Sequence, residues 1–339
     1  MRNSDKIRDF ILDNVEDNPK SISSMTMKHF GLSRQAVSHN IRNLIKEGLL
    51  AAKGNTRNRE YTLKPITDKV FSLEISKDLQ EHNVWTQYFE DYFKQFNKNI
   101  VGICNYGFTE MFNNIVDHSD GLESIIGYTH LPNKVMIFVS DNGIGIFNKI
   151  AMELRLSDKR EAILELSKGK LTTDPDNHTG EGIFYTSRIF DRFSILSGDL
   201  FFSHSHLGDW LIEDKEEETK GTHVRMVIST KSPRTLEELF NEFAGEQYDY
   251  TFNGTHVPLL LTKYGDEKLV SRSQAKRVLA RFERFTEVIL DFTGVDFVGQ
   301  AFVDEIFRVY KLKNPKTKIL WVKANERIDT MIKGIISKS

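Results

Sequence analysis

The sequence predicts an α+β protein of several domains, and three observations lead to this fold class. The first 64 residues combine apolar residues at helical spacing with a final pair of strand patterns. The middle of the chain alternates apolar strand patterns with glycine-containing turns. The last third follows a strand–helix–strand–helix–strand order. Because 339 residues are enough for two or three domains, we predict domains at residues 1–64, 65–230 and 231–339.

The first predicted domain contains three helices and a hairpin. Helices are expected over residues 4–14 and 22–30, where apolar residues recur at intervals of three and four. A third helix is expected to begin after Ser33, since serine is a favoured N-cap residue. Two short strands on either side of the Gly54-Asn55 turn complete the pattern.

Residues 32–50 resemble winged helix-turn-helix transcription regulators, and the resemblance implies contact with duplex DNA. The charge agrees, because residues 1–64 hold 12 Lys and Arg against 7 Asp and Glu in a chain of net charge −2. Polar side chains that face away from the apolar stripe of the third helix could meet base edges and phosphates. The predicted DNA-contacting residues are Arg34, Gln35, Ser38, His39 and Arg42 on the helix, and Lys53, Arg57 and Arg59 on the wing. The alternative is a protein-interaction module with a solvated charged face.

Four short motifs follow one another in the second predicted domain. They run from Glu110 to His118, from Asp141 to Gly145, from Gly180 to Ile183, and from Gly221 to Thr222. Glu110, Asn114 and His118 are four residues apart, so they project from one face of the expected helix. An amide oxygen such as that of Asn114 suits Mg²⁺, and a carboxylate one turn earlier is placed to activate water against a phosphate. Asp141 lies at the end of a predicted strand.

In this order the motifs resemble the ATP site of the GHKL family, over roughly residues 70–228. That family includes type II topoisomerases, mismatch-repair ATPases, histidine kinases and anti-sigma serine kinases. The resemblance implies a Bergerat α/β sandwich that binds ATP and Mg²⁺. It implies Glu110 as the general base for hydrolysis, Asn114 as the metal ligand and Asp141 as the acceptor for the adenine amino group. The other nucleotide-binding residues that it implies are Asp117, His118, Gly143, Gly145, Gly180, Gly182, Ile183 and Thr222.

The branch of the family stays open. His118 followed by Ser119 is closest to the anti-sigma kinases and switch ATPases, whereas Asp117 is similar to the topoisomerase and mismatch-repair pattern. The polar stretch 148–179 is expected to form a mobile lid over the nucleotide. The fourth motif is expected to open a strand and to help close the base pocket.

The third predicted domain begins with a connector helix and continues as a small α/β unit. Residues 288–302 resemble STAS domains, the fold of anti-anti-sigma factors. In that family a helix can begin at a phosphorylatable serine, but Gly299-Gln300-Ala301 stands at this position, and Thr293 remains on the preceding loop. We therefore expect a structural or partner-docking role for this domain.

Together these patterns predict a regulator in which the nucleotide state controls DNA or partner binding, with slow ATP hydrolysis and an ATP-dependent homodimer. Two alternatives stay open: an anti-sigma-type serine/threonine kinase, and an ATPase effector of a defence system. The single cysteine, Cys104, excludes an internal disulfide framework. No run approaches the ~18 apolar residues of a membrane span. We therefore expect a cytoplasmic protein without membrane contact.

Overall fold

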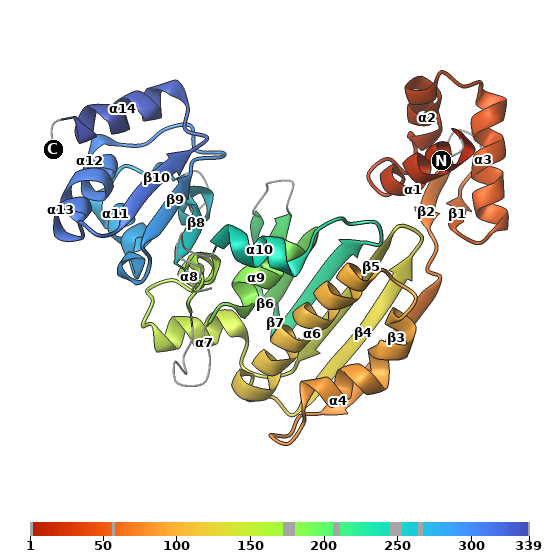
Figure 1. Cartoon of the computed structure of the whole chain (residues 1–339), viewed down its shortest axis with the longest axis horizontal. Coiled ribbons are helices and arrows are strands. Elements are labelled where there is room, and N and C mark those ends of the chain that lie inside the picture. The colour runs from red at the N-terminus through yellow and green to blue at the C-terminus, as the bar shows by residue number, and fades with distance from the viewer. Residues whose placement is uncertain are drawn as a thin grey trace.

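The computed structural model describes residues 3–55, 58–171, 180–205, 211–243, 253–263 and 267–337, with the backbone alone for residues 3 and 211–217. These residues form an α+β structure (Figure 1). Along the described chain, a two-stranded sheet comes first, a five-stranded sheet follows, and a three-stranded sheet comes last. No helix of the described residues is long and apolar enough to cross a lipid bilayer.

The N-terminal part builds its core around α3. Its elements are α1 (Asn3–Asn14), α2 (Ile22–Phe30), α3 (Arg34–Lys46) and the antiparallel strands β1 (Leu50–Lys53) and β2 (Glu60–Leu63). Helix α3 begins where the sequence predicts, because Ser33 Oγ accepts the N–H of Ala36 at 3.3 Å. The apolar stripe of Val37, Ile41 and Leu44 is buried against side chains of α1 and α2. These elements lie close to their predicted ranges.

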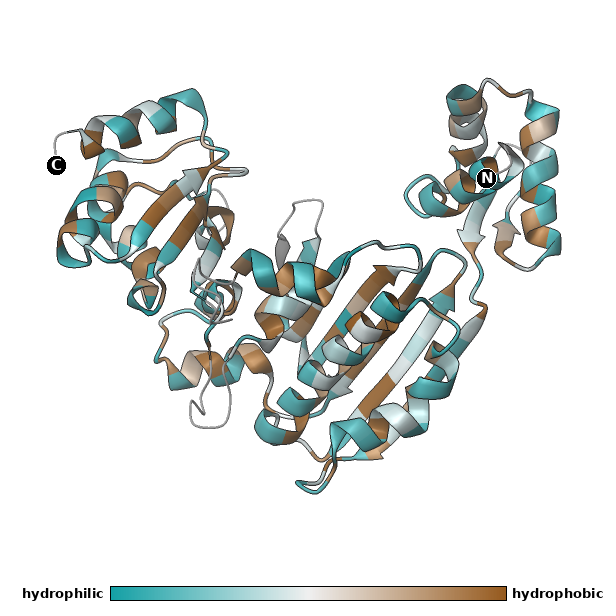
Figure 2. Cartoon of the chain, viewed as in Figure 1, coloured by the Kyte–Doolittle hydropathy of each residue, from teal (hydrophilic) through white to brown (hydrophobic). Residues whose placement is uncertain are grey.

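The five-stranded sheet occupies the middle of the molecule and is antiparallel throughout, in the order β3-β4-β5-β7-β6. Its strands are β3 (Thr67–Glu74), β4 (Glu123–Leu131), β5 (Lys134–Asp141), β6 (Arg192–Ser205) and β7 (Leu211–Ser229). Helices lie along one face of this sheet (Figure 1). They include α4 (Glu81–Trp85), α6 (Lys98–His118), α9 (Gly182–Ile189) and the predicted connector helix, α10 (Leu236–Phe243). Apolar residues are frequent along the strands (Figure 2), as expected for a sheet that packs against helices.

The predicted lid is the first correction. Most of the described part of residues 148–179 is helical, in α7 (Ile146–Glu153) and α8 (Glu161–Lys168), and residues 172–179 lie outside the described part. Every side chain of α8 after Glu161 is buried. The lid was predicted from the polarity of this stretch, but the charged residues of α8 are not solvated. Glu165 and Lys168 form a buried ion pair at 2.6 Å. Helix α8 is therefore part of the core.

The fourth motif is the second correction. Gly221 and Thr222 lie inside β7, which begins at Leu211, and do not open a strand. Strands β6 and β7 change register on both sides of Gly198, and Gly221 has a φ of +78°. A bulge of this kind interrupts the alternation of side chains and looks like a strand boundary in the sequence.

The C-terminal part contains a parallel sheet in the order β10-β9-β8. Its elements are β8 (Gly254–Pro258), η3 (Leu259–Thr262), α11 (Arg272–Leu279), η4 (Phe282–Arg284), β9 (Glu287–Asp291), α12 (Gln300–Asp304), η5 (Glu305–Tyr310), α13 (Lys311–Lys313), β10 (Lys318–Val322) and α14 (Glu326–Ile336). Helices connect each strand to the next, as parallel strands require. Val288, Leu290 and Phe302 are buried in one core that continues into the helices of the central sheet.

Candidate nucleotide site

A cavity of about 320 Å³ lies among α6, α7, α8, α9 and the strands β5, β6 and β7. This volume falls within the range of roughly 300–1,000 Å³ that is usual for small-molecule pockets. All four predicted motifs reach it. The predicted residues that line it are Glu110, Asn114, His118, Asp141, Gly145, Gly180, Gly182, Ile183 and Thr222.

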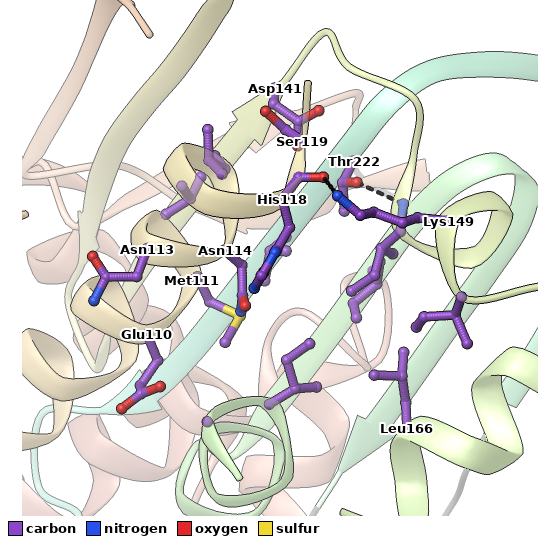
Figure 3. A pocket seen from close by; sticks show the side chains of 18 of the residues that line it. Glu110, Met111, Asn113, Asn114, His118, Ser119, Asp141, Lys149, Leu166 and Thr222 are labelled. Atoms are coloured by element: carbon purple, nitrogen blue, oxygen red, sulfur yellow. Dashed lines mark hydrogen bonds between the residues drawn. The ribbon is translucent and has the colours of Figure 1, made fainter. Parts of the chain in front are cut away.

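One wall of the cavity is a row of side chains on α6. Glu110, Asn114 and His118 follow one another at successive turns of the helix, as the spacing of four predicts (Figure 3). Asp141 lies beyond the His118 end of this row (Figure 3). The cavity therefore has an Asp141 end and a Glu110 end. Apolar side chains line the space between them: Met111, Ile115, Val139, Ile146, Ile150, Leu166, Leu171, Ile195 and Val224.

At the Asp141 end, a buried carboxylate faces the cavity. Asp141 is the last residue of β5 and is 5% exposed. Burial raises its pKa above the ordinary aspartate value, and hydrogen bonds from Gly143 and Thr222 oppose this rise. The Gly143 N–H donates to Asp141 Oδ1 at 2.8 Å and fixes the orientation of the carboxylate. An acceptor held within an apolar wall suits a ligand that donates a hydrogen bond there.

Gly143 acts on the site without lining the cavity. A Cβ at this position would lie 1.9 Å from the carbonyl oxygen of Ser119, just after α6. Only glycine therefore lets the turn after β5 approach the end of α6 this closely. This approach brings Asp141 next to the α6 row.

At the Glu110 end, a carboxylate lies against the first turn of a helix. A Cβ on Gly182, the first residue of α9, would lie 2.0 Å from Glu110 Oε2, so a larger residue there would displace the carboxylate. The N-terminus of a helix carries partial positive charge and attracts carboxylates and phosphates. The charge of Glu110 is also felt by Tyr106, whose pKa is raised by burial and by that charge. This end of the cavity therefore combines a carboxylate with the partial positive charge of a helix N-terminus.

Asp117 stands apart from the other residues of the first motif. Its side chain is exposed on α6, and it does not line the cavity. A nucleotide contact by Asp117 stays a prediction.

Lys149 is a cavity residue that the sequence analysis missed. Its Nζ donates to the carbonyl oxygen of His118 at 2.7 Å (Figure 3). The same Nζ lies 3.7 Å from a carboxylate oxygen of Asp120. Its side chain is 19% exposed. Its position four residues after Gly145, the last residue of the second motif, was the available signal. The start of this helix is held by Thr222 Oγ1, which accepts the N–H of Ile146 at 3.0 Å.

The predicted DNA-contacting residues lie on a different surface. Helix α3 lies on the side of the N-terminal part away from the central sheet (Figure 1). The exposed residues of the predicted set are Arg34, Gln35, Ser38, His39 and Arg42 on α3, with Lys53 and Arg59 on the hairpin, and Arg57 lies outside the described residues. Arg42 Nε donates to the carbonyl oxygen of Ser38 at 3.3 Å. DNA contact by this surface stays a prediction.

Comparison with known proteins supports one part of the chain. Residues 274–329 match a family described as a STAS-like domain of unknown function (DUF4325). A STAS-like domain is therefore confirmed there, and the match begins within α11 and ends within α14. No curated protein matches the chain. The GHKL and winged-helix resemblances stay predictions.

Proposed function

We propose that the chain is an ATP-binding regulator whose nucleotide state controls contact with DNA or with a protein partner. The observation that carries this proposal is the convergence of the four motifs. Of eleven residues assigned to the site by resemblance, nine line one cavity, and Asp117 and Gly143 do not. These nine come from segments far apart in the sequence.

The two ends of the cavity suit the two ends of ATP. Asp141 offers a fixed, buried acceptor for the adenine amino group. The start of α9 at Gly182 offers backbone N–H groups to phosphate. The apolar wall between them suits the flat base.

The residues at the Glu110 end also fit a magnesium ion. Asn114 supplies an amide oxygen and Glu110 a carboxylate, which are the hard oxygen donors that Mg²⁺ prefers. Asn114 would hold the ion together with phosphate oxygens. When bound, Mg²⁺ would neutralise phosphate charge.

For hydrolysis, Glu110 would orient a water molecule and accept its proton at a carboxylate oxygen. Positioned base catalysis contributes about 10²–10⁴-fold, so Glu110→Gln should nearly eliminate phosphate release while ATP affinity survives. Phosphate release and ATP affinity should be measured on one preparation. Equal release by wild type and variant would refute the role of Glu110. Radiolabelled γ-phosphate that stays on protein would instead favour the kinase alternative.

ATP binding itself is tested by thermal stability. Ligand at a hundred times its Kd stabilises a protein by about 2.7 kcal/mol. We expect this stabilisation for the wild type with Mg²⁺ and ATP, and its loss in Asn114→Ala and Asp141→Ala. Lys98→Ala is the matched control, because its side chain is exposed on the same helix and lies outside the cavity. If ATP stabilises both cavity variants as much as the wild type, the proposed site is wrong.

A further inference from the structure

The STAS-like domain reaches the wall of the cavity through one side chain. Arg281 lies between α11 and η4, and its side chain is 11% exposed. One guanidinium nitrogen, Nη1, donates to Glu165 Oε2 in α8 at 3.0 Å. The other, Nη2, donates to the carbonyl oxygens of Gly169, at 3.0 Å, and of Lys170. Arg281 therefore holds the end of α8 and the two residues that follow it.

The next residue of the chain forms part of the cavity. Leu171 lines it, and the N–H of Leu171 donates to the carbonyl oxygen of Gly180 at 3.1 Å. A Cβ on Gly180 would lie 2.4 Å from the backbone of Leu171, so the two backbones are in direct contact. A short path thus leads from Arg281 through Lys170 and Leu171 to the glycines of the third motif.

Further contacts fix the same helix to the same domain. Lys168 has no exposed side-chain surface and donates to the carbonyl oxygen of Ala280 at 2.9 Å and to Glu165 Oε1 at 2.6 Å. The hydroxyl of Thr255, in β8, donates to the carbonyl oxygen of Lys168 at 2.7 Å. Helix α8 therefore cannot shift away from the cavity without breaking buried polar contacts, which are costly to leave unpaired.

The backbone on both sides of this contact is in a conformation that needs support. Arg281 has a φ of +66° and Lys170 a φ of +50°. A residue with a Cβ rarely adopts the left-handed region, and it persists there where the surroundings hold it. The hydrogen bond from Arg281 to the Lys170 carbonyl joins these two residues directly.

We propose that Arg281 is a positioning residue for the nucleotide site, so that the STAS-like domain completes the phosphate end of the cavity. The inference rests on the proposed function for the identity of the ligand. Because coupling between sites is reciprocal, ATP should strengthen the docking of the STAS-like domain on α8. A partner that draws this domain away from α8 should lower ATP affinity by the same factor.

The proposal predicts which part of ATP is affected. Arg281 supports the segment beside Gly180, whereas Asp141 ends β5 and is held by Gly143. Loss of the guanidinium should therefore weaken the binding of ATP more than that of adenosine. A role in global folding alone would weaken both ligands alike.

The test uses the full chain and the substitution Arg281→Gly, because glycine tolerates the left-handed backbone while the guanidinium is lost. The Kd of Mg²⁺-ATP and of adenosine should be measured at a temperature where every variant is folded. Allosteric coupling is typically about 5–150-fold, and we expect a rise of this order in the Kd of ATP with a smaller change for adenosine. Arg281→Lys, which keeps a cation, should restore part of the loss. The control is Arg308→Ala, which removes an ion pair with Asp304 elsewhere in the same domain.

Hydrogen exchange without ligand separates this inference from the proposed function. In Arg281→Gly the amide of Leu171 should exchange faster than in the wild type, and in Arg308→Ala it should not. A wild type that binds no ATP would refute the proposed function, while faster exchange would still support the positioning of Leu171. Unchanged exchange at Leu171, or equal weakening of ATP and adenosine, would overturn the inference. If Arg281→Gly does not fold, Arg281→Lys gives the same two measurements with smaller changes.

Discussion

The two ends of the chain are attached to the central sheet in different ways. The N-terminal part has its own core, which includes Leu131 of β4, and polar contacts also join it to the sheet. Asn133, in the turn between β4 and β5, donates to the carbonyl oxygen of Leu12 at 3.1 Å, and Lys231 lies 2.6 Å from Asp9. The C-terminal part instead shares one core with the helices of the sheet.

The ion pairs show the same contrast. In the pair between Lys231 and Asp9, the lysine side chain is 58% exposed, whereas in the pair between Arg281 and Glu165 the arginine side chain is 11% exposed. Exposed ion pairs contribute about 0–1 kcal/mol, but breaking a buried one costs about 3–5 kcal/mol. This difference indicates that the N-terminal part can change position at a small cost in free energy. The C-terminal part cannot move without disturbing α8 and, through it, the cavity.

Removing each end in turn should give the largest difference. A chain without residues 1–64 should keep cooperative unfolding and ATP binding, because among the described residues Leu131 is the one buried member of the lost core that lies outside this range. A chain without residues 231–339 should lose both, because buried side chains of α8 would face water. Circular dichroism melting and ATP titration measure these outcomes. A cooperative transition at the wild-type temperature in the second chain would contradict the comparison.

Glu165→Ala should have the next largest effect. The variant leaves Lys168 buried and removes the carboxylate that Arg281 also contacts. We expect a loss of about 3–5 kcal/mol in the free energy of unfolding, measured by urea titration. Glu287→Ala, which breaks an exposed pair with Lys318, is the control and should cost about 0–1 kcal/mol. A similar loss in the free energy of unfolding for the two variants would show that burial does not make one ion pair more important for stability than the other.

Substitutions on α3 should affect DNA binding and leave ATP binding unchanged. If Arg34 contacts a base edge, Arg34→Ala should cost about 1–3 kcal/mol of binding and relax sequence preference. If Arg42 contacts a phosphate, Arg42→Ala should reduce the slope of binding against salt by about 1. Lys46→Ala, at the end of the same helix, is the control. DNA binding that is insensitive to salt would favour a protein-interaction module.

The sequence could predict what local rules determine. The start of α3 follows from Ser33, and the α6 row follows from the spacing of Glu110 and Asn114. The buried α8 could not be predicted, because Glu165 looks like a solvated residue until Arg281 is known to contact it. These two residues are 116 positions apart, and no local pattern indicates such a pair.

The cavity residues show the same limit of prediction from local sequence patterns. Nine of them were assigned to the site by resemblance, but Lys149 belongs to no motif and is fixed by the carbonyl of His118. Asp117 fits a motif and yet is exposed, because a match of residue types does not determine which side of the helix faces the cavity. The irregular strand geometry at Gly221 could not be predicted for a related reason, because a bulge changes the register of the strands without changing the composition of the sequence.

The smallest expected effect is that of Lys231→Ala, which breaks the exposed pair between the sheet and Asp9 of α1. The loss in the free energy of unfolding should be at most about 1 kcal/mol, because solvent screens the pair and Asp9 stays hydrated. ATP affinity should not change, since neither residue lines the cavity. A freer N-terminal part should, however, be detectable as faster proteolysis between residues 63 and 67, relative to Lys318→Ala as the control. A loss as large as that of Glu165→Ala would mean that the two ends are held with equal strength.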